Sequence, residues 1–240
     1  MSNASVTRES WPNQRYAWFV VIILMTLYIF SFIDRMIIAL LVAPIKADLN
    51  LTDTHIGLLH GLAFALFYTF MGIFIARLAD NWNRTKLIAI GVLVWGLATA
   101  ACGLAGSFAS LFVARVLVGV GEASLSPAAY SMISDYFPPE KRARAMSVYT
   151  SGIYFGVGAA LIFGGIVIGL INRMGGLSLP LVGSVEPWQA VFFAVGLPGV
   201  LFFLIVRLFV REPERREVSA TPPTFAAFRA FAMQRRELYL

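Results

Sequence analysis

LFVARVLVGVGEASLSPAAYSMISD, the stretch at residues 111–135, decides how this sequence folds. It is apolar enough to cross a bilayer, yet it contains Arg115 and Glu122. On a helix these two side chains project within about 20° of one another, with Gly119 and Ser126 on the same stripe. A charge at the centre of a membrane helix costs roughly 2.5–3.5 kcal/mol. We therefore expect both charges to face a protein interior or a water-filled cavity, and to mark a functional site.

Composition places the chain among membrane proteins. Hydrophobic residues make up 59% of the 240 residues and charged residues only 13%, against about 25% charged in soluble domains. The apolar blocks approach the ~20 residues that cross ~30 Å of hydrocarbon. The sequence predicts an all-α polytopic membrane protein with six transmembrane helices. They are expected at about 16–43, 54–78, 87–105, 110–134, 145–172 and 188–209.

The chain is expected to consist of three parts. We expect residues 1–15 to form a tail, residues 16–210 the six-helix bundle, and residues 211–240 the start of a linker. Phe225, Phe228 and Phe231 have near-helical spacing, so this linker is a candidate amphipathic helix. With the N-terminus inside, the outer loops contain only Lys46 and Arg173 of the 19 cations. The positive-inside rule then predicts cytoplasmic N- and C-termini in a plasma or bacterial inner membrane.

Several function classes are disfavoured by the sequence. The net charge of +6 follows from cations beside the spans, so topology explains it better than nucleic-acid binding. Cys102 is the single cysteine, and His55 and His60 flank the start of a span. We expect no disulfide, no metal site and no cofactor. No nucleophile–base pair appears near one membrane face, so we do not expect an enzyme.

Buried charges also occur in the first span. Asp34 lies about 24 Å along the helix from the interfacial Trp18, while Arg115 lies about 8 Å deep from the opposite face. The two are at similar heights, and pairing between them is plausible. Glu122 lies nearer the centre, where it either pairs with Arg115 to assist insertion or loads and releases a proton. Arg35 is rotated about 100° from Asp34. We expect it to face a different neighbour or to extend outward.

Two further features have two interpretations each. The turn ARLADNWNRTK at 76–86 contains Asp80 at one helix end and Arg84 and Lys86 at the start of the next. It forms either a charge clasp between helices or a solvated positive-inside loop.

Small residues are the other feature. Gly119 and Gly121 of the fourth span and Gly152 and Gly156 of the fifth would allow close helix packing. That packing would be static, or it would permit sliding during gating.

Taken together, these features resemble the N-terminal half of a major facilitator superfamily transporter. The turn at 76–86 is similar to the signature turn of that superfamily at Leu78, Ala79, Asp80 and Arg84, and departs from it at Ala76, Asn81 and Asn83. Within the superfamily the chain resembles spinster-like transporters. The shared segments are FIDR at 32–35, RVLVGVGEASLSPAAYSMISDYF at 115–137 and RAMSVY at 144–149.

The resemblance implies a fold and a function. It implies half of a twelve-helix fold, built as two inverted three-helix repeats. It also implies a proton-linked secondary transporter with Asp34, Arg35, Arg115 and Glu122 in the central cavity. Partners would be an amphiphilic or anionic small molecule, protons, membrane lipids and the missing C-terminal six-helix half. Animal relatives handle lysophospholipids and phosphorylated sphingoid bases.

Alternatives stay open beside this interpretation. The organic-anion:cation symporters share a similar first-span Asp-Arg and fourth-span Gly-Glu. A complete six-span protein, acting as a dimeric carrier, a channel subunit or a membrane scaffold, is the alternative of another class.

Overall fold

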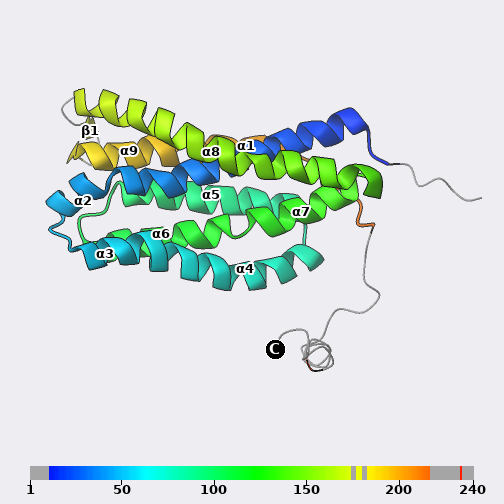
Figure 1. Ribbon diagram of the computed structural model, residues 1–240, viewed down its shortest axis with the longest axis horizontal. Coiled ribbons are helices and arrows are strands. Elements are labelled where there is room, and N and C mark those ends of the chain that lie inside the picture. Colours follow the sequence, from blue (N-terminus) through cyan, green and yellow to red (C-terminus); the bar gives the residue numbers. More distant parts are fainter. Residues whose placement is uncertain (1–10, 174–176, 180–182, 217–232, 234–240) are drawn as a thin grey trace, which may run out of the picture.

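The structure, a computed structural model, describes residues 11–173, 177–179, 183–216 and 233. Within this part of the chain, six helical spans are long and apolar enough to cross a membrane. They lie side by side along the long axis of the molecule (Figure 1). The first three spans consist of α1 (Gln14–Leu40), then α3 (Asp53–Gly57) with the π-helical turn η1 (Leu58–Leu62) and α4 (Ala63–Asn81), then α5 (Arg84–Cys102).

The last three spans follow the same alternation. They consist of α6 (Phe108–Glu122) with α7 (Leu125–Tyr136), then α8 (Pro139–Arg173), then α9 (Pro187–Gly196) with α10 (Pro198–Phe209). The short helix α2 (Val42–Asp48) follows α1, and the antiparallel pair β1 (Leu177–Leu179) and β2 (Gly183–Val185) lies between α8 and α9. The first span is therefore shorter than expected, because α1 ends at Leu40 and a separate helix follows it.

Prolines divide the fourth and sixth spans. Pro127 has no N–H and its ring displaces the carbonyl of Ala123, so α6 ends at Glu122 and α7 begins at Leu125. Pro198 separates α9 from α10 in the same way. Glu122 is therefore the last residue of α6, at a break in its span.

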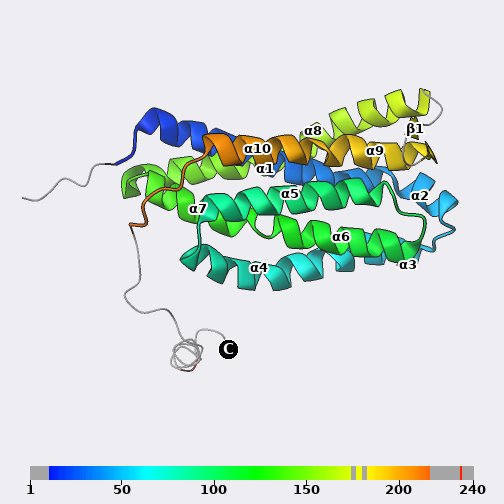
Figure 2. The ribbon, with the colours of Figure 1, turned by 180° about the vertical axis from the view of Figure 1, so that it is seen from behind.

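Contacts between the spans follow a repeated pattern. The first span packs against the fifth (α1 with α8), and the fourth packs against the second (α6 with α4). The third and sixth spans pack together, and Figure 2 shows α9 and α10 lying along α5. The first helix of each three-span repeat thus packs against the second helix of the other repeat. Because three spans reverse direction an odd number of times, the two repeats are inverted relative to one another.

Glycines allow the closest of these contacts. A Cβ at Gly121 would come within 2.7 Å of the backbone nitrogen of Trp95, and one at Gly119 within 2.8 Å of the Phe64 carbonyl oxygen. A Cβ at Gly156 would come within 2.6 Å of the Phe32 Cβ. Gly152 is also tight, with 3.0 Å to the Met25 carbonyl oxygen. All four glycines singled out in the sequence lie where two helices leave no room for a side chain.

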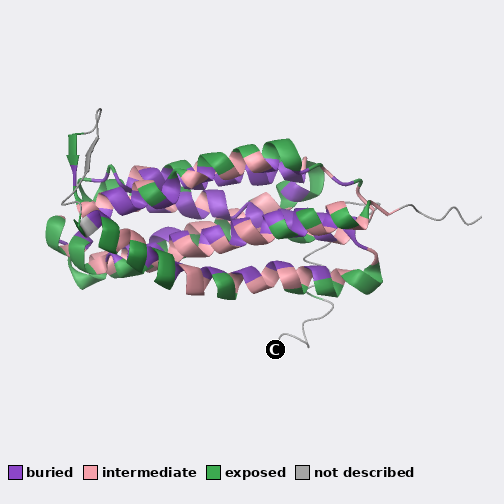
Figure 3. Ribbon diagram, turned by 90° about the horizontal axis from the view of Figure 1, so that it is seen from above, coloured by how far each residue is buried: buried purple, intermediate pink, exposed green. Residues whose placement is uncertain are grey.

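Burial is uneven among the spans. Only 17% of the most apolar stretch is buried in the spans at 53–81 and 139–171, against 67% in Arg84–Cys102. Exposed residues, green in Figure 3, lie on the outer sides of the helices. They include large side chains such as Phe74 on α4 and Tyr154 and Phe155 on α8. In a membrane such faces meet either lipid or further protein.

The two terminal segments are described only in part. Residues 11–13 precede α1, and residues 211–216 follow α10 without helical structure. The expected amphipathic helix with Phe225, Phe228 and Phe231 lies outside the described residues, as does most of the expected tail at 1–15.

Candidate functional site

Two ion pairs lie between α1 and α6 in the middle of the bundle. Arg115 Nη1 is 3.0 Å from Asp34 Oδ1, and Arg35 Nε is 2.7 Å from Glu122 Oε2. Asp34, Arg115 and Glu122 are at most 1% exposed. The side chain of Arg35 is 19% exposed, so it is the member of the group that solvent reaches.

A hydroxyl group donates a further hydrogen bond to each of the two carboxylates. Thr99 Oγ1 of α5 donates to Asp34 Oδ2, and Ser31 Oγ of α1 donates to Glu122 Oε2 at 2.6 Å. Each carboxylate therefore receives one cationic and one neutral donor, which offsets the cost of burying its charge.

The pairing differs from one sequence-based expectation and agrees with another. Asp34 and Arg115 are in contact, as their similar depths predict. Arg115 and Glu122 share a stripe of α6, but each pairs with α1 and not with the other. The expectation that Arg35 faces a different neighbour is met in part. Its guanidinium lies against Phe64 and Tyr68 of α4. Its ion pair, however, is with Glu122 of α6, the helix that Asp34 also contacts.

Aromatic rings surround the guanidinium of Arg35. Its Cζ lies 4.8 Å from the ring centroid of Phe32 and 4.7 Å from those of Phe64 and Tyr68. The Cζ of Arg115 lies 5.6 Å from the Phe64 ring. A cation above an aromatic face is stabilised by the quadrupole of the ring. These rings hold Arg35 in one orientation.

Sequence reasoning did not identify these supporting residues. Phe64 and Tyr68 are four residues apart and so share one face of the second span, and Ser31 lies one turn before Asp34. That spacing is a usable signal. It is weak, because many apolar and hydroxyl side chains in a membrane protein have it without lining a site.

Two buried polar atoms of the group have no hydrogen-bond partner among the described residues. They are Glu122 Oε1 and Arg115 Nε. Buried polar atoms are nearly always paired, so an orphaned carboxylate oxygen has capacity for a proton or for a donor from a ligand.

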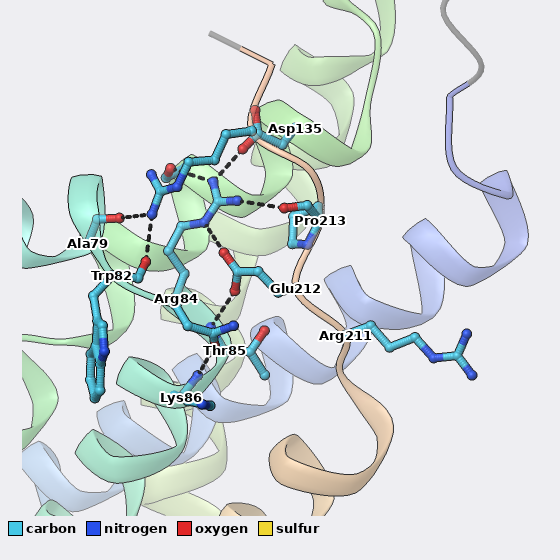
Figure 4. Close-up of polar contacts among 12 residues, drawn as sticks. Ala79, Trp82, Arg84, Thr85, Lys86, Asp135, Arg211, Glu212 and Pro213 are labelled. Carbon is cyan, nitrogen blue, oxygen red and sulfur yellow. Dashed lines mark hydrogen bonds and ion pairs between the residues drawn. The ribbon is translucent and has the colours of Figure 1, made fainter. Parts of the chain in front are cut away.

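A second polar cluster lies at the end of the bundle where α4 meets α5, which we call the Arg84 end. Arg84 is fully buried, and Figure 4 shows its polar contacts. Its Nη1 donates to Asp135 Oδ2 and to Ser131 Oγ, the latter at 2.8 Å. Its Nε donates to Glu212 Oε1 at 2.7 Å, and its Nη2 donates to the Pro213 carbonyl at 3.1 Å. The guanidinium thus joins α5, α7 and the segment after α10.

The segment at 211–216, which we call the strap, is attached across this end at several further points. Glu212 Oε2 accepts from the backbone nitrogen of Thr85 at 2.9 Å. Arg215 Nη2 donates to the carbonyls of Ala79 and Trp82 at 2.7 and 2.6 Å (Figure 4). Tyr136 Oη donates to the Arg211 carbonyl at 2.5 Å. The strap thereby satisfies backbone groups at the end of α4 and the start of α5, and its own backbone is bonded by a side chain of α7.

Of the two interpretations of the turn at 76–86, the charge clasp does not form between Asp80 and the cations of the turn. Asp80 is exposed and has no hydrogen bond or ion pair with the described residues, and Lys86 contributes only its backbone nitrogen, which donates to Asn83 Oδ1 at 2.7 Å. Arg84 pairs instead with Asp135 and Glu212, which lie far from it in the sequence. No local spacing could have indicated these partners.

Comparison with known proteins places the whole arrangement in a family. The family model described as Major Facilitator Superfamily matches residues 24–239, nearly the whole chain. This chain belongs to the Major Facilitator Superfamily.

Individual members of the superfamily show the same relationship. An MFS-type efflux pump of Mycolicibacterium smegmatis is 32% identical over 87% of this chain and 44% of its own length. Protein spinster homolog 1 of Xenopus tropicalis is 33% identical over 63% of this chain and 29% of its own length.

A solved structure of another superfamily member is also similar to this chain. A bacterial homolog to the human lysosomal transporter Spinster, in an inward-facing and occupied conformation, is 41% identical with a TM-score of 0.79. That match covers 87% of this chain and 47% of the other. This chain thus spans less than half the length of these relatives and corresponds to the N-terminal half of the fold.

Proposed function

We propose that this chain forms one half of a spinster-like secondary transporter, in which Asp34, Arg35, Arg115 and Glu122 bind substrate and protons. The observation that supports this most directly is the pair of buried ion pairs between the first helices of the two inverted repeats. Midplane sites of secondary transporters lie at such repeat interfaces. The unpartnered Oε1 of Glu122 offers a position for a proton.

The arrangement supports a simple exchange between proton and substrate. A proton on Glu122 removes the charge that holds Arg35, and Ser31 can still hydrogen-bond to the neutral acid. The guanidinium of Arg35, partly exposed and framed by three rings, is then available to an anionic group. Release of the proton restores the ion pair and displaces the anion.

The rings beside Arg35 favour a particular class of substrate. An anion that reaches Arg35 also meets Phe32, Phe64 and Tyr68. We therefore propose an amphiphilic or anionic small molecule whose apolar part lies beside its charge. An organic-anion:cation symporter of the same superfamily is the alternative within the class. A six-helix scaffold or channel subunit without carrier activity is the alternative of another class.

The Arg84 end is proposed as the cytoplasmic gate. The distribution of Lys and Arg supports this orientation, with both termini in the cytoplasm. Asp80 and Lys86 are exposed beside the buried Arg84, so they are available to a second six-helix half. Residues 211–240 would begin the linker to that half.

Uptake by proteoliposomes that contain the full-length protein tests the proposal. A lysophospholipid and a sugar acid are compared, each with and without a pH gradient. We expect gradient-driven uptake of the lysophospholipid and its loss in Glu122→Gln. Asp53→Asn, which changes an exposed acid at the far end of the bundle, is the matched control and should keep uptake. Gradient-driven uptake that persists in Glu122→Gln would contradict proton coupling through this residue.

A further inference from the structure

A cavity of about 610 Å³ lies at the end of the bundle opposite Arg84, between α1, α2, α8 and α9. It is separate from the site between α1 and α6. Ile168 and Val191 line it from within α8 and α9, Leu40 lines it at the last residue of α1, and Asp48 and Glu186 line it from just beyond the span ends. The cavity therefore has an apolar part inside the membrane span and a charged part at its edge.

The depth of the two parts matches the layers of a bilayer. The 27 residues of α1 extend about 40 Å at 1.5 Å per residue, longer than a ~30 Å hydrocarbon core. Leu40 at the end of α1 and Glu186 immediately before α9 thus lie at the level of lipid headgroups. The indole of Trp188, whose Nε1 donates to Asp48 Oδ2 at 3.0 Å, has the position typical of interfacial aromatic residues.

Both carboxylates of the cavity lack a cation. Asp48 accepts from the indole of Trp188, and the side chain of Glu186 accepts from a backbone N–H at the start of α9. Neither makes an ion pair within the described part of the chain, and the nearby Lys46 is paired with Asp53 instead. Each carboxylate keeps lone pairs for a further donor, and together they make this mouth of the cavity negative.

We propose that this cavity binds a membrane phospholipid with a primary ammonium headgroup, such as phosphatidylethanolamine. An ammonium has three N–H donors, which suit two carboxylates that line one cavity. A quaternary ammonium has none, and an anionic headgroup would be repelled. The inference does not depend on transport.

The acyl chains of such a lipid have apolar surface within the cavity itself, where Ile168 of α8 and Val191 of α9 form part of its lining. A second groove of about 600 Å³ between α8 and α9 is apolar throughout, with Val167 and Leu170 on one side and Phe193 and Leu197 on the other. It offers a further apolar surface on the same two helices. A soluble cation would gain nothing from these apolar surfaces, so a lipid fits the cavity better than a free amine.

Native mass spectrometry of the purified full-length protein tests the proposal. Phosphatidylethanolamine, phosphatidylcholine and phosphatidylglycerol with identical acyl chains are titrated separately. We expect phosphatidylethanolamine to bind about tenfold more tightly than either of the others, since one charge-assisted hydrogen bond corresponds to roughly that factor. In Asp48→Asn/Glu186→Gln this preference should disappear. Both replacements keep an amide oxygen that can accept from Trp188 and from the start of α9.

Glu140→Gln/Glu214→Gln is the control, because it changes the net charge by the same amount at two exposed acids outside the cavity and leaves the Lys46–Asp53 ion pair in place. It should leave the preference for phosphatidylethanolamine intact. Equal binding of the three lipids, an unchanged preference in Asp48→Asn/Glu186→Gln, or an equal loss in Glu140→Gln/Glu214→Gln would each overturn the proposal. The last result would mean that general surface charge, and not the cavity, selects the lipid.

Discussion

Arg115 is tolerated inside the bundle only because Asp34 faces it. The Asp34 carboxylate is fully buried, and its hydrogen-bond donors among the described residues are Arg115 and Thr99. Removing its charge leaves the guanidinium of Arg115 uncompensated in a region that water does not reach. At the scale of single residues, the stability of the site therefore depends on the pair and not on either member.

Asp34→Asn should lower the free energy of unfolding by about 3–5 kcal/mol, because it leaves one buried charge without its partner. Thermal unfolding of the detergent-purified protein measures the loss. The exposed change Asp53→Asn should cost at most about 1 kcal/mol. Replacing both partners, as Asp34→Asn/Arg115→Met, should recover most of the stability. A single variant as stable as the parent would show that water reaches Arg115.

At the scale of elements, packing against neighbouring helices determines the position of the fourth span. Gly121 lies against the backbone of α5, and the next residue, Glu122, is directed toward α1 by the end of α6. Close packing on one side thus fixes the position of a charge on the other. The strap works differently, since polar groups and not packing hold it across the ends of three helices.

Gly121→Ala should destabilise the protein by about 1–3 kcal/mol through overpacking, because the new methyl would overlap the backbone of Trp95. Gly158→Ala is the matched control, since a Cβ there meets nothing within 4 Å. It should be neutral or stabilising, given the higher helix propensity of alanine. Thermal unfolding of the two variants side by side decides the point. Equal melting temperatures would show that α5 and α6 separate at no cost.

Glu212→Gln should loosen the strap, because Arg84 then keeps only one of its two carboxylates. A hydrogen bond to a charged group contributes about 1.5–3 kcal/mol, so trypsin cleavage at Arg215 should accelerate about tenfold or more. Limited digestion followed by mass spectrometry measures the rate. Glu214→Gln, two residues along the strap and exposed, should leave the rate unchanged. Similar rates in both variants would mean that Glu212 does not hold the strap.

At the scale of the whole molecule, the six spans differ in how far they are buried. The second and fifth spans are the least buried and present large apolar side chains outward. The proposed second half would cover these faces. The two polar clusters lie in different places, one between α1 and α6 and one at the Arg84 end.

Membrane orientation can be measured with single cysteines, since the native Cys102 is buried. We expect Asp53→Cys to react with a membrane-impermeant maleimide in intact cells, and Asp80→Cys to react only after permeabilisation. Both positions are exposed, so access depends on the side of the membrane alone. The parent protein should remain unlabelled. The reverse labelling pattern would contradict cytoplasmic termini.

The sequence by itself determined the number of spans and their approximate limits, because runs of apolar residues long enough to cross a bilayer have no other stable place. It also determined that Asp34, Arg115 and Glu122 lie inside the helical bundle, since an ionised side chain that faces the hydrocarbon core is energetically unfavourable. The similar heights of Asp34 and Arg115 followed from helix geometry alone.

Only the tertiary structure decided which charges meet. Arg35 pairs with Glu122, and Arg84 pairs with Asp135 and Glu212 instead of Asp80, because these contacts depend on how separate helices pack. Helical periodicity fixes the direction in which a side chain leaves its own helix. Which partner lies there, and how far a long arginine bends to reach it, depends on neighbours that are remote in the sequence.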